Sequence, residues 1–261
     1  MRNVIVCGCM VVVAASEAGA ANLRAQLTAQ QIVDKSLERN AFGFENAIGK
    51  LTLTLISKRG TVRQRVIEIR SRAQGKLGKT LVRFHAPADI AGTGFLILER
   101  DDADDDQYLY LPALGKVKRI TSSQRNQRFM GTDLTYADLE SRNLRRATVK
   151  RLEDAPVGGA DTYVISALPE DPKDSQYGKT ISWIHKTAFV PLKVEFYDKK
   201  MKLLKTLSVH RLEKKEGRWV VMDSTIKNVQ AGTKTRMLVD SIDFEAKLTD
   251  NDFTQRALAG G

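Results

Sequence analysis

The sequence predicts a mainly β protein with a few helices: one large antiparallel sheet, curled into an incomplete barrel, with helices closing its concave side. Three observations lead to this fold class. Many short segments alternate apolar and polar residues, turn residues separate these segments, and strands do not alternate regularly with helices along the sequence. A sheet this long must curl, close or be covered. Because a curled antiparallel sheet of about a dozen strands encloses more space than its side chains fill, we expect an apolar cavity.

Residues 1–20 have the features of a secretory signal peptide. Arg2 supplies the charged start, Val4–Ala15 is an apolar run, and Ala18-Gly19-Ala20 has the small residues that a signal peptidase reads. The apolar run is too short for a comfortable membrane span, which needs about 20 residues. We therefore expect cleavage after Ala20, export, and a periplasmic mature protein. No linker or repeat divides residues 21–261, which predicts a single domain.

The mature chain is predicted to begin with one helix and to continue with strands. Thr28 and Gln31 have the spacing of a capping box, and Val33 and Leu37 follow on one helical face, which predicts a helix over Ala29–Arg39. The period then changes to two. The predicted strands are Leu51–Leu55, Thr61–Arg72, Leu81–Phe84, Phe95–Leu98, Tyr108–Leu111, Val117–Ile120, Thr162–Ala167, Lys179–His185, Leu192–Tyr197, Leu203–Leu212, Arg218–Asp223, Ser224–Val229 and Lys234–Glu245.

The sequence lacks the common motifs of catalysis and of metal or cofactor binding. His85, His185 and His210 are far apart and have no partner at metal-ligand spacing. Gly92-Thr93-Gly94 precedes a strand and lacks the third glycine of a dinucleotide fingerprint. The acidic run Asp101–Asp106 lacks calcium-loop spacing, so a solvated loop is expected. We expect a protein that is not an enzyme and has no cofactor and no metal.

The chain is basic, with a net charge of +11, and many of its cations lie between Lys116 and Arg151. Such a surface suits nucleic acid, anionic lipid or an acidic partner. Because an exported protein rarely meets nucleic acid, we expect none as a partner. Anionic headgroups, met during transient membrane contact, or an acidic protein partner remain, as does a plain solvated face.

Two segments are the most distinctive in the chain. Residues 108–120 read YLYLPALGKVKRI, and residues 129–139 read FMGTDLTYADL. Together they resemble the outer membrane lipoprotein-sorting protein family, the longer relatives of the periplasmic carrier LolA. Weaker similarities extend the resemblance from about Leu27 to Phe253. The smaller LolA carrier lacks residues like 108–139, so its cargo does not transfer directly.

The resemblance implies a curled, incomplete barrel with an apolar concave face that binds acyl chains of lipoproteins or free lipids. It also implies that the protein functions together with a membrane transporter of the resistance–nodulation–division (RND) type. Residues expected in the acyl cavity or its lid are Leu96, Leu98, Tyr108, Leu109, Tyr110, Leu111, Phe129, Met130, Leu134, Tyr136, Leu139, Trp183, Leu192, Val194 and Phe196. Rim cations expected near a headgroup are Lys116, Lys118 and Arg119.

Two details of this site stay open at the level of sequence. Alternation in Tyr108–Leu111 puts tyrosines on one face and leucines on the other, without showing which face is concave. Phe129-Met130-Gly131 reads as an exposed apolar loop before a short helix capped by Thr135. This loop and helix are either a lid over the cavity mouth or a plug that completes the core.

Three functions are consistent with the sequence. The first is a monomeric, non-enzymatic periplasmic carrier of acyl chains for transfer toward the outer membrane. The second is a periplasmic adaptor of an RND-type transporter without a cargo of its own. The third is an exported hydrolase whose active-site residues are dispersed along the chain.

Overall fold

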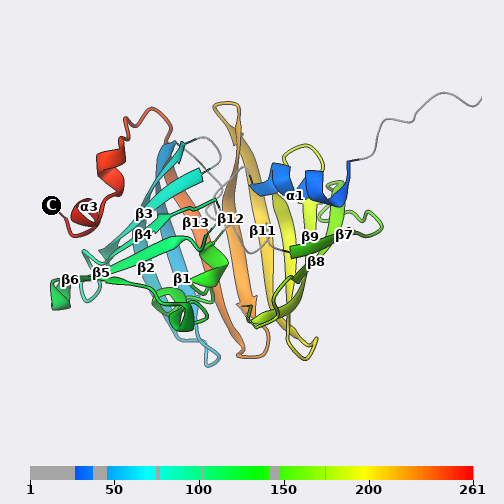
Figure 1. The fold of residues 1–261 in the computed structure, drawn as a ribbon, viewed down its shortest axis with the longest axis horizontal. Coiled ribbons are helices and arrows are strands. Elements are labelled where there is room, and N and C mark those ends of the chain that lie inside the picture. Colours follow the sequence, from blue (N-terminus) through cyan, green and yellow to red (C-terminus); the bar gives the residue numbers. More distant parts are fainter. Residues whose placement is uncertain are drawn as a thin grey trace, which may run out of the picture.

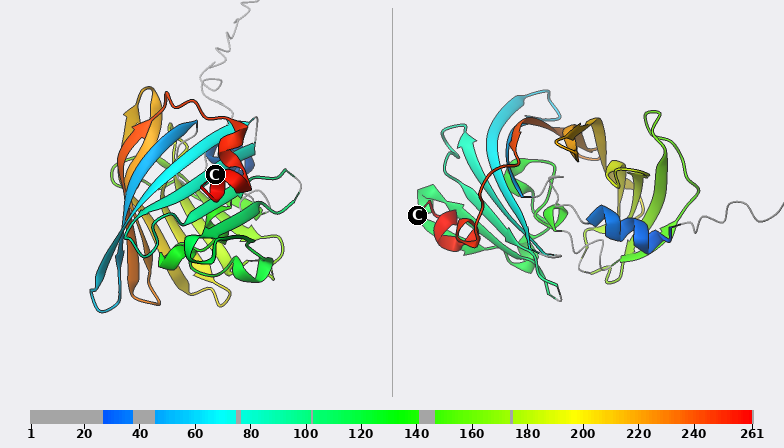
Figure 2. Two further views of the ribbon diagram at one scale, coloured as in Figure 1. Left: turned by 90° about the vertical axis from the view of Figure 1, so that its left-hand side faces the viewer. Right: turned by 90° about the horizontal axis from the view of Figure 1, so that it is seen from above.

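The fold is a single 13-stranded antiparallel sheet that curls without closing into a barrel (Figure 1). The computed structural model describes residues 27–37, 46–74, 77–101, 103–140, 147–173 and 175–260. Seen from above, the sheet follows an open C, with helix α1 and a green segment inside the C and helix α3 outside it (Figure 2). The predicted fold class is confirmed. The predicted signal peptide lies outside the described residues.

The strands follow one another in the sheet in the order β6-β5-β4-β3-β2-β1-β13-β12-β11-β10-β9-β8-β7, so β6 and β7 form its edges. Their bounds are β1 Ala47–Ile56, β2 Val62–Gln74, β3 Leu77–Ala86, β4 Gly94–Leu98, β5 Asp106–Leu111, β6 Lys116–Arg119, β7 Ala147–Arg151, β8 Thr162–Pro169, β9 Tyr177–His185, β10 Pro191–Asp198, β11 Leu203–Lys215, β12 Arg218–Asn228 and β13 Thr233–Asp243. Nearly all the neighbours along the sheet are hairpin partners, so local turns set most of the register.

Two features of this sheet differ from the predicted strands. The segments Arg218–Asp223 and Ser224–Val229 form one continuous strand, β12, because Asp223 is paired across the ladder with Arg236 and does not interrupt it. Strand β7 was not predicted, and it forms the edge next to β8.

The main apolar core lies on the concave side of β1–β4, β12 and β13. Its sheet residues include Leu53, Ile67, Phe84, Phe95 and Val220, all of which are buried. Residues 120–140, which we call the inner segment, complete this core and contain the short 3-10 turns η2 (Ser122–Gln124), η3 (Phe129–Gly131) and η4 (Ala137–Leu139). The inner segment runs inside the C of the sheet (Figure 2).

Helix α1 (Ala29–Leu37) covers the other arm of the sheet. Ile32 and Val33 are buried against Ile165 of β8 and Ile184 of β9. The predicted capping box is present: the Thr28 amide donates to the Gln31 side chain at 2.9 Å, and the Gln31 amide donates to the Thr28 hydroxyl at 3.2 Å.

The C-terminal residues cover the convex side of β3–β6. Turn η5 (Asp250–Phe253) and helix α3 (Gln255–Leu258) place Phe253 and Leu258 on a second buried cluster. Arg83 donates to the carbonyl oxygens of Ala257 at 2.7 Å and Leu258 at 2.8 Å. Gly94 permits this contact, because a Cβ there would lie 2.6 Å from the Leu258 side chain. Within the described ranges, no helix has the length and apolar character needed to cross a membrane.

Candidate functional site

The candidate site is the concave face of the sheet together with the two elements that cover it, α1 and the inner segment. Phe129 of the inner segment is 1% exposed. Its ring lies 5.0 Å from that of Phe95, 5.9 Å from that of Phe84 and 5.6 Å from that of Tyr136. The prediction that Phe129 lies in an exposed loop is wrong, because these aromatic rings bury it against the sheet.

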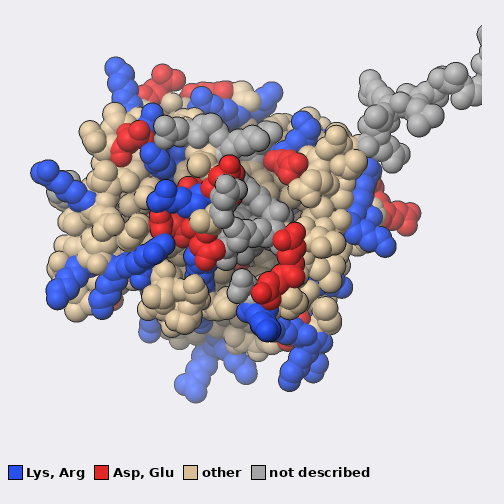
Figure 3. Space-filling view, in the orientation of Figure 1, with Lys and Arg blue, Asp and Glu red and all other residues tan. Residues whose placement is uncertain are grey.

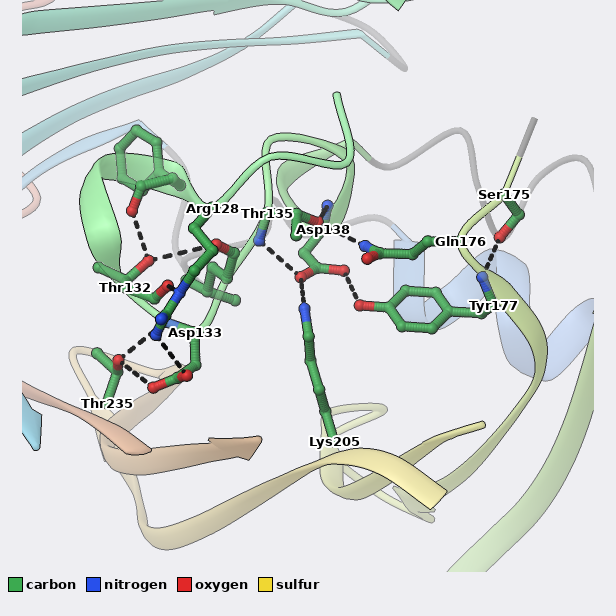
Figure 4. Close-up of polar contacts among 12 residues, drawn as sticks. Arg128, Thr132, Asp133, Thr135, Asp138, Ser175, Gln176, Tyr177, Lys205 and Thr235 are labelled. Carbon is green, nitrogen blue, oxygen red and sulfur yellow. Dashed lines mark hydrogen bonds and ion pairs between the residues drawn. The ribbon is translucent and has the colours of Figure 1, made fainter. Parts of the chain in front are cut away.

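Polar anchors hold the inner segment to β13 on one side. Asp133 is buried, and its carboxylate accepts hydrogen bonds from Arg128 at 2.7 Å and from the Thr235 hydroxyl at 2.8 Å (Figure 4). The Thr233 hydroxyl donates to the same carboxylate. The Asp133 amide in turn donates to the Thr235 hydroxyl at 3.0 Å. The anchor therefore joins the segment to two positions of β13.

A second anchor reaches across the C to β9 and β11. Asp138 accepts from the Lys205 ammonium at 3.0 Å and from the Tyr177 hydroxyl at 2.6 Å (Figure 4). The amide of Thr135 donates to the same carboxylate at 2.8 Å, and the amide of Asp138 donates to the Thr135 hydroxyl at 3.3 Å. The predicted pairing of Thr135 with Asp138 is therefore present, although the residue directly before η4 is Tyr136. Burial raises the pKa of Tyr177 well above its usual value, and the Asp138 carboxylate raises it further. Tyr177 is therefore a neutral donor to Asp138.

The end of the inner segment carries a third group of charges. Arg125 lies 3.2 Å from Glu140 and 2.6 Å from Asp104. Burial raises the pKa of Glu140 to about 7, although the Arg125 charge lowers it. Asp105 and Asp106 are also buried, and Asp106 pairs with Arg100 and Arg119. The expectation that this part of the acidic run is a solvated loop is wrong, because arginines cover it.

These anchors have an energetic meaning. Burying a carboxylate and an ammonium costs several kcal/mol of lost hydration per ion, which their attraction offsets only in part. The Asp138 and Lys205 side chains are each 4% exposed. If the segment moves away from the sheet, both groups regain water, whereas apolar side chains in the same place would regain nothing. Moving the inner segment off the concave face therefore costs less free energy than moving an apolar segment of the same size would cost.

A small apolar pocket of about 10 Å³, which is room for about one water molecule, lies between α1 and the sheet. The wide apolar cavity expected from the sequence is therefore not open at this place, and the inner segment fills the main part of the concave face. Val33 and Ser36 of α1 line one side of it. Ile165, Ala167, Ser182, Ile184 and Pro191, from β8, β9 and β10, line the other side. The only polar groups in this lining are the two serine hydroxyls, so the pocket suits a hydrocarbon rather than a charged ligand.

The structure divides the predicted cavity residues between the two faces of the sheet. On the concave side are Leu109, Phe129, Met130, Leu134, Tyr136 and Leu139, which belong to or pack on the main core. Leu111 shares the face of Leu109 two residues earlier on β5. Val194 pairs with the pocket residue Ser182, and Phe196, on the same face, contacts the ring of Tyr177 at 5.0 Å.

Other predicted cavity residues lie elsewhere. Leu96, Leu98, Tyr108 and Tyr110 pack in the convex cluster with α3. Trp183 faces away from its neighbours Ser182 and Ile184, and the Lys193 ammonium lies 4.2 Å from its ring centroid. Leu192 is buried beside a register shift in β10. Alternation alone did not separate these sets, because α3 makes the convex side of β3–β6 apolar as well.

The predicted rim cations lie on the edge strand β6. Lys116 and Lys118 are exposed and pair with Leu111 and Leu109 of β5, on the concave side. Arg119 points the other way and forms an ion pair with Asp106. Charged side chains also protect such an edge from pairing with another chain.

The three histidines lie in separate places. His85 is 3.9 Å from Glu68, and His185 accepts from the amides of Thr187 and Ala188. His210 bonds to the Thr225 hydroxyl at 2.9 Å. Among the residues that the structure describes, no three His, Cys, Asp or Glu side chains converge in a group that suits a metal ion.

Sequence reasoning missed the partners of the inner segment, above all Lys205 and Tyr177. One signal for Lys205 was present. It stands at a concave position of β11, with the same parity as Leu207, where an apolar residue is the rule. A lysine at such a position requires a buried carboxylate, and Asp138 supplies it.

Solved structures share this curled antiparallel sheet. A LolA superfamily protein from Nitrosomonas europaea has this fold, with a TM-score of 0.68 and 19% identity over 88% of this chain and 99% of that chain. A DUF1329 family protein from Desulfovibrio piger matches with a TM-score of 0.79 and 27% identity over the same shares.

A putative outer membrane lipoprotein-sorting protein domain from Vibrio parahaemolyticus is 32% identical, with a TM-score of 0.79. The match covers 88% of this chain and 99% of that domain. A family model described as that of an uncharacterized protein matches residues 76–260. No curated protein sequence matches. The chain belongs to the outer membrane lipoprotein-sorting protein family, as the resemblance of residues 108–139 predicted.

Proposed function

We propose that the protein is a periplasmic, non-enzymatic carrier that binds acyl chains of lipoproteins or free lipids on its concave face, for transfer toward the outer membrane. One observation carries this proposal: the concave face is apolar, and it is covered by α1 and the inner segment rather than by a second sheet. The kinship with a lipoprotein-sorting domain supports the same role. The carrier acts as a monomer, and an RND-type transporter is its partner at the membrane.

The pocket beneath α1 is the proposed entrance for the acyl chain. Its lining is apolar, and it lies on the same side of the sheet as the inner segment. A long acyl chain extends beyond these seven residues and reaches the space of the inner segment. In this proposal the segment is a lid, and the acyl chain displaces it.

The energies of the two competing states are of similar size. Each buried CH₂ contributes about 0.8 kcal/mol, so one long acyl chain contributes on the order of 10 kcal/mol. Displacing the aromatic cluster around Phe129 costs several kcal/mol. The hydration that Asp133 and Asp138 regain when the segment moves offsets part of this free energy. Capture and release are thus both accessible without covalent chemistry.

Titration with the fluorescent fatty acid cis-parinaric acid tests the proposal. The mature protein should bind it saturably. Ser36→Trp should weaken binding at least tenfold, because the indole fills the pocket beneath α1. Asp34→Trp, on the exposed side of the same helix, is the matched control and should bind as the parent does.

Thermal unfolding of both tryptophan variants, followed by circular dichroism, shows whether each is folded. Absence of saturable binding by the parent protein overturns the proposed function. Equal binding by the parent and a folded Ser36→Trp variant places the acyl chain outside the pocket and contradicts the proposed entrance.

A further inference from the structure

Three hairpin tips lie next to one another at one end of the sheet. They are the turns β1–β2 (residues 57–63), β10–β11 (residues 198–202) and β12–β13 (residues 227–234), at the bottom of Figure 1. Gln230 donates to Asp198 at 2.9 Å, which joins two of them. The third turn, β1–β2, contacts the β12–β13 turn through Lys58, whose side chain would lie 3.2 Å from a Cβ built on Gly232. We call this end the tip surface.

Each turn of the tip surface exposes a large apolar side chain. Val62 is 56% exposed, Met201 is 53% exposed and Val229 is 41% exposed. A single exposed apolar residue is ordinary, but one on each of three joined turns is a pattern. Met201 also has a φ of 59°, a backbone conformation for which glycine or asparagine is the usual choice. The Met201 sulfur lies near Gly178 of β9, where a Cβ would be 3.3 Å from it, so part of this side chain packs on the sheet.

The tip surface is also strongly basic. Its exposed cations are Lys58, Arg59, Arg63, Lys199, Lys200, Lys202, Lys227 and Lys234. None of them forms an ion pair with any residue in the described part of the chain. The one carboxylate within these turns is Asp198, which accepts hydrogen bonds from the amides of Lys200 and Lys202 and from Gln230. Lys and Arg side chains line this lower edge in Figure 3.

We propose that the tip surface docks the protein on an anionic phospholipid bilayer. Isolated apolar side chains enter the boundary between headgroups and acyl chains, while flexible lysines around them meet the phosphates. A stable protein interface instead needs a contiguous apolar centre within a polar rim, and the three apolar side chains stand on separate turns among lysines. This inference concerns the hairpin turns at the end of the sheet, not the concave face, and goes beyond the proposed carrier function. The two surfaces meet at Thr233, whose hydroxyl donates to Asp133 of the inner segment.

Co-sedimentation of the mature protein with vesicles tests the docking surface. Phosphatidylglycerol vesicles should bind it, phosphatidylcholine vesicles should bind it far more weakly, and added salt should release it. The triple variant Lys199→Ser, Lys200→Ser, Lys202→Ser should bind about 100-fold more weakly, because each cation near an anionic membrane contributes about one factor of five. Met201→Asn, which suits the local backbone, should also weaken binding.

The opposite end of the sheet provides matched controls. Lys50→Ser, Lys214→Ser, Lys247→Ser removes the same charge from exposed positions toward that end, and Leu152→Ser removes an apolar side chain that is 37% exposed. Both controls should bind vesicles nearly as the parent does. Absence of binding to phosphatidylglycerol vesicles, or equal loss in the two triple variants, overturns the proposal.

The same variants separate this inference from the carrier function. Titration with cis-parinaric acid reports the concave site and should be unchanged in the Lys199, Lys200, Lys202 variant. A protein that binds vesicles through the tip surface but never binds the fatty acid contradicts the carrier function alone. A protein that binds the fatty acid but not the vesicles contradicts the docking surface alone.

Discussion

The ion pair between Asp138 and Lys205 gives the sharpest prediction about the inner segment. Both side chains are 4% exposed, and their charged atoms lie 3.0 Å apart. Lys205→Met leaves the Asp138 carboxylate buried with neutral donors only, and Asp138→Asn leaves the Lys205 ammonium buried beside a neutral amide. The double variant removes both charges, and the asparagine oxygen still accepts the hydrogen bond from Tyr177, while the Thr135 amide loses its acceptor.

The expected magnitudes follow from this burial. Removing one member of a buried pair costs about 3–5 kcal/mol, whereas replacing both members by neutral side chains of similar shape is close to neutral. Each single variant should therefore lose about 3 kcal/mol of unfolding free energy. The double variant should lie within about 2 kcal/mol of the parent, because only the Thr135 amide loses its acceptor, and the coupling energy is then several kcal/mol.

Urea denaturation of the four proteins measures this cycle, and cis-parinaric acid titration of the same samples measures its effect on binding. In the double variant, opening of the segment no longer returns hydration to two charges, so acyl binding should weaken about tenfold or more while stability is retained. Additivity of the two single changes to within about 0.5 kcal/mol would refute the buried pair. Unchanged binding by the stable double variant would refute the role of the segment as a lid.

Three further predictions address other parts of the structure. Phe129→Ala should lower the unfolding free energy by about 3–5 kcal/mol in urea denaturation, because it empties the aromatic cluster, and a loss below about 1 kcal/mol would contradict that packing. The pKa of Glu140 is raised from 4.5 to about 7, so between these pH values the folded state holds a proton that the unfolded state has lost, and the unfolding free energy should fall as pH rises through this range. Glu140→Gln should flatten this dependence of the unfolding free energy on pH and should gain up to about 3 kcal/mol at pH 8. An unchanged dependence would contradict the raised pKa. Arg83→Met should speed amide hydrogen exchange in residues 248–260 by tenfold or more, and equal protection would show that Arg83 does not hold α3.

Most of the sheet was predictable because period-two alternation is a local property. Strands such as β1 and β9 have clear alternation and definite turns at their ends. Strand β7 follows a basic stretch and is only five residues long, so its pattern is too short to stand out. The split of β12 was an error, since an aspartate within a strand is tolerated when an arginine on the next strand pairs with it.

The site was less predictable, because its definition depends on curvature. Alternation predicted that Tyr108–Leu111 has two distinct faces, but both are covered by other parts of the chain. Leu109 packs in the concave core, and Tyr108 packs beneath α3. Which face is concave depends on the curl of the whole sheet and on a C-terminal helix that periodicity did not indicate. The family resemblance identified the right segment without assigning its side chains to a face.

The buried anchors show a second limit of sequence reasoning. Asp133 and Asp138 stand in the distinctive segment, and the cap between Thr135 and Asp138 was predictable from its spacing. Their partners Thr235 and Lys205 lie at least 67 positions away in the sequence, and no local pattern joins such residues. Only the curl of the sheet brings them together.

Photo-crosslinking with a diazirine-bearing palmitate, followed by peptide mapping, tests the central claim most directly. The account predicts that labels appear on concave residues beneath α1, such as Ile165 and Ile184, and on the inner segment. An excess of unmodified palmitate should prevent this labelling. Absence of competed labelling, or labelling confined to the convex residues around Trp183 and α3, would contradict an acyl-binding concave face.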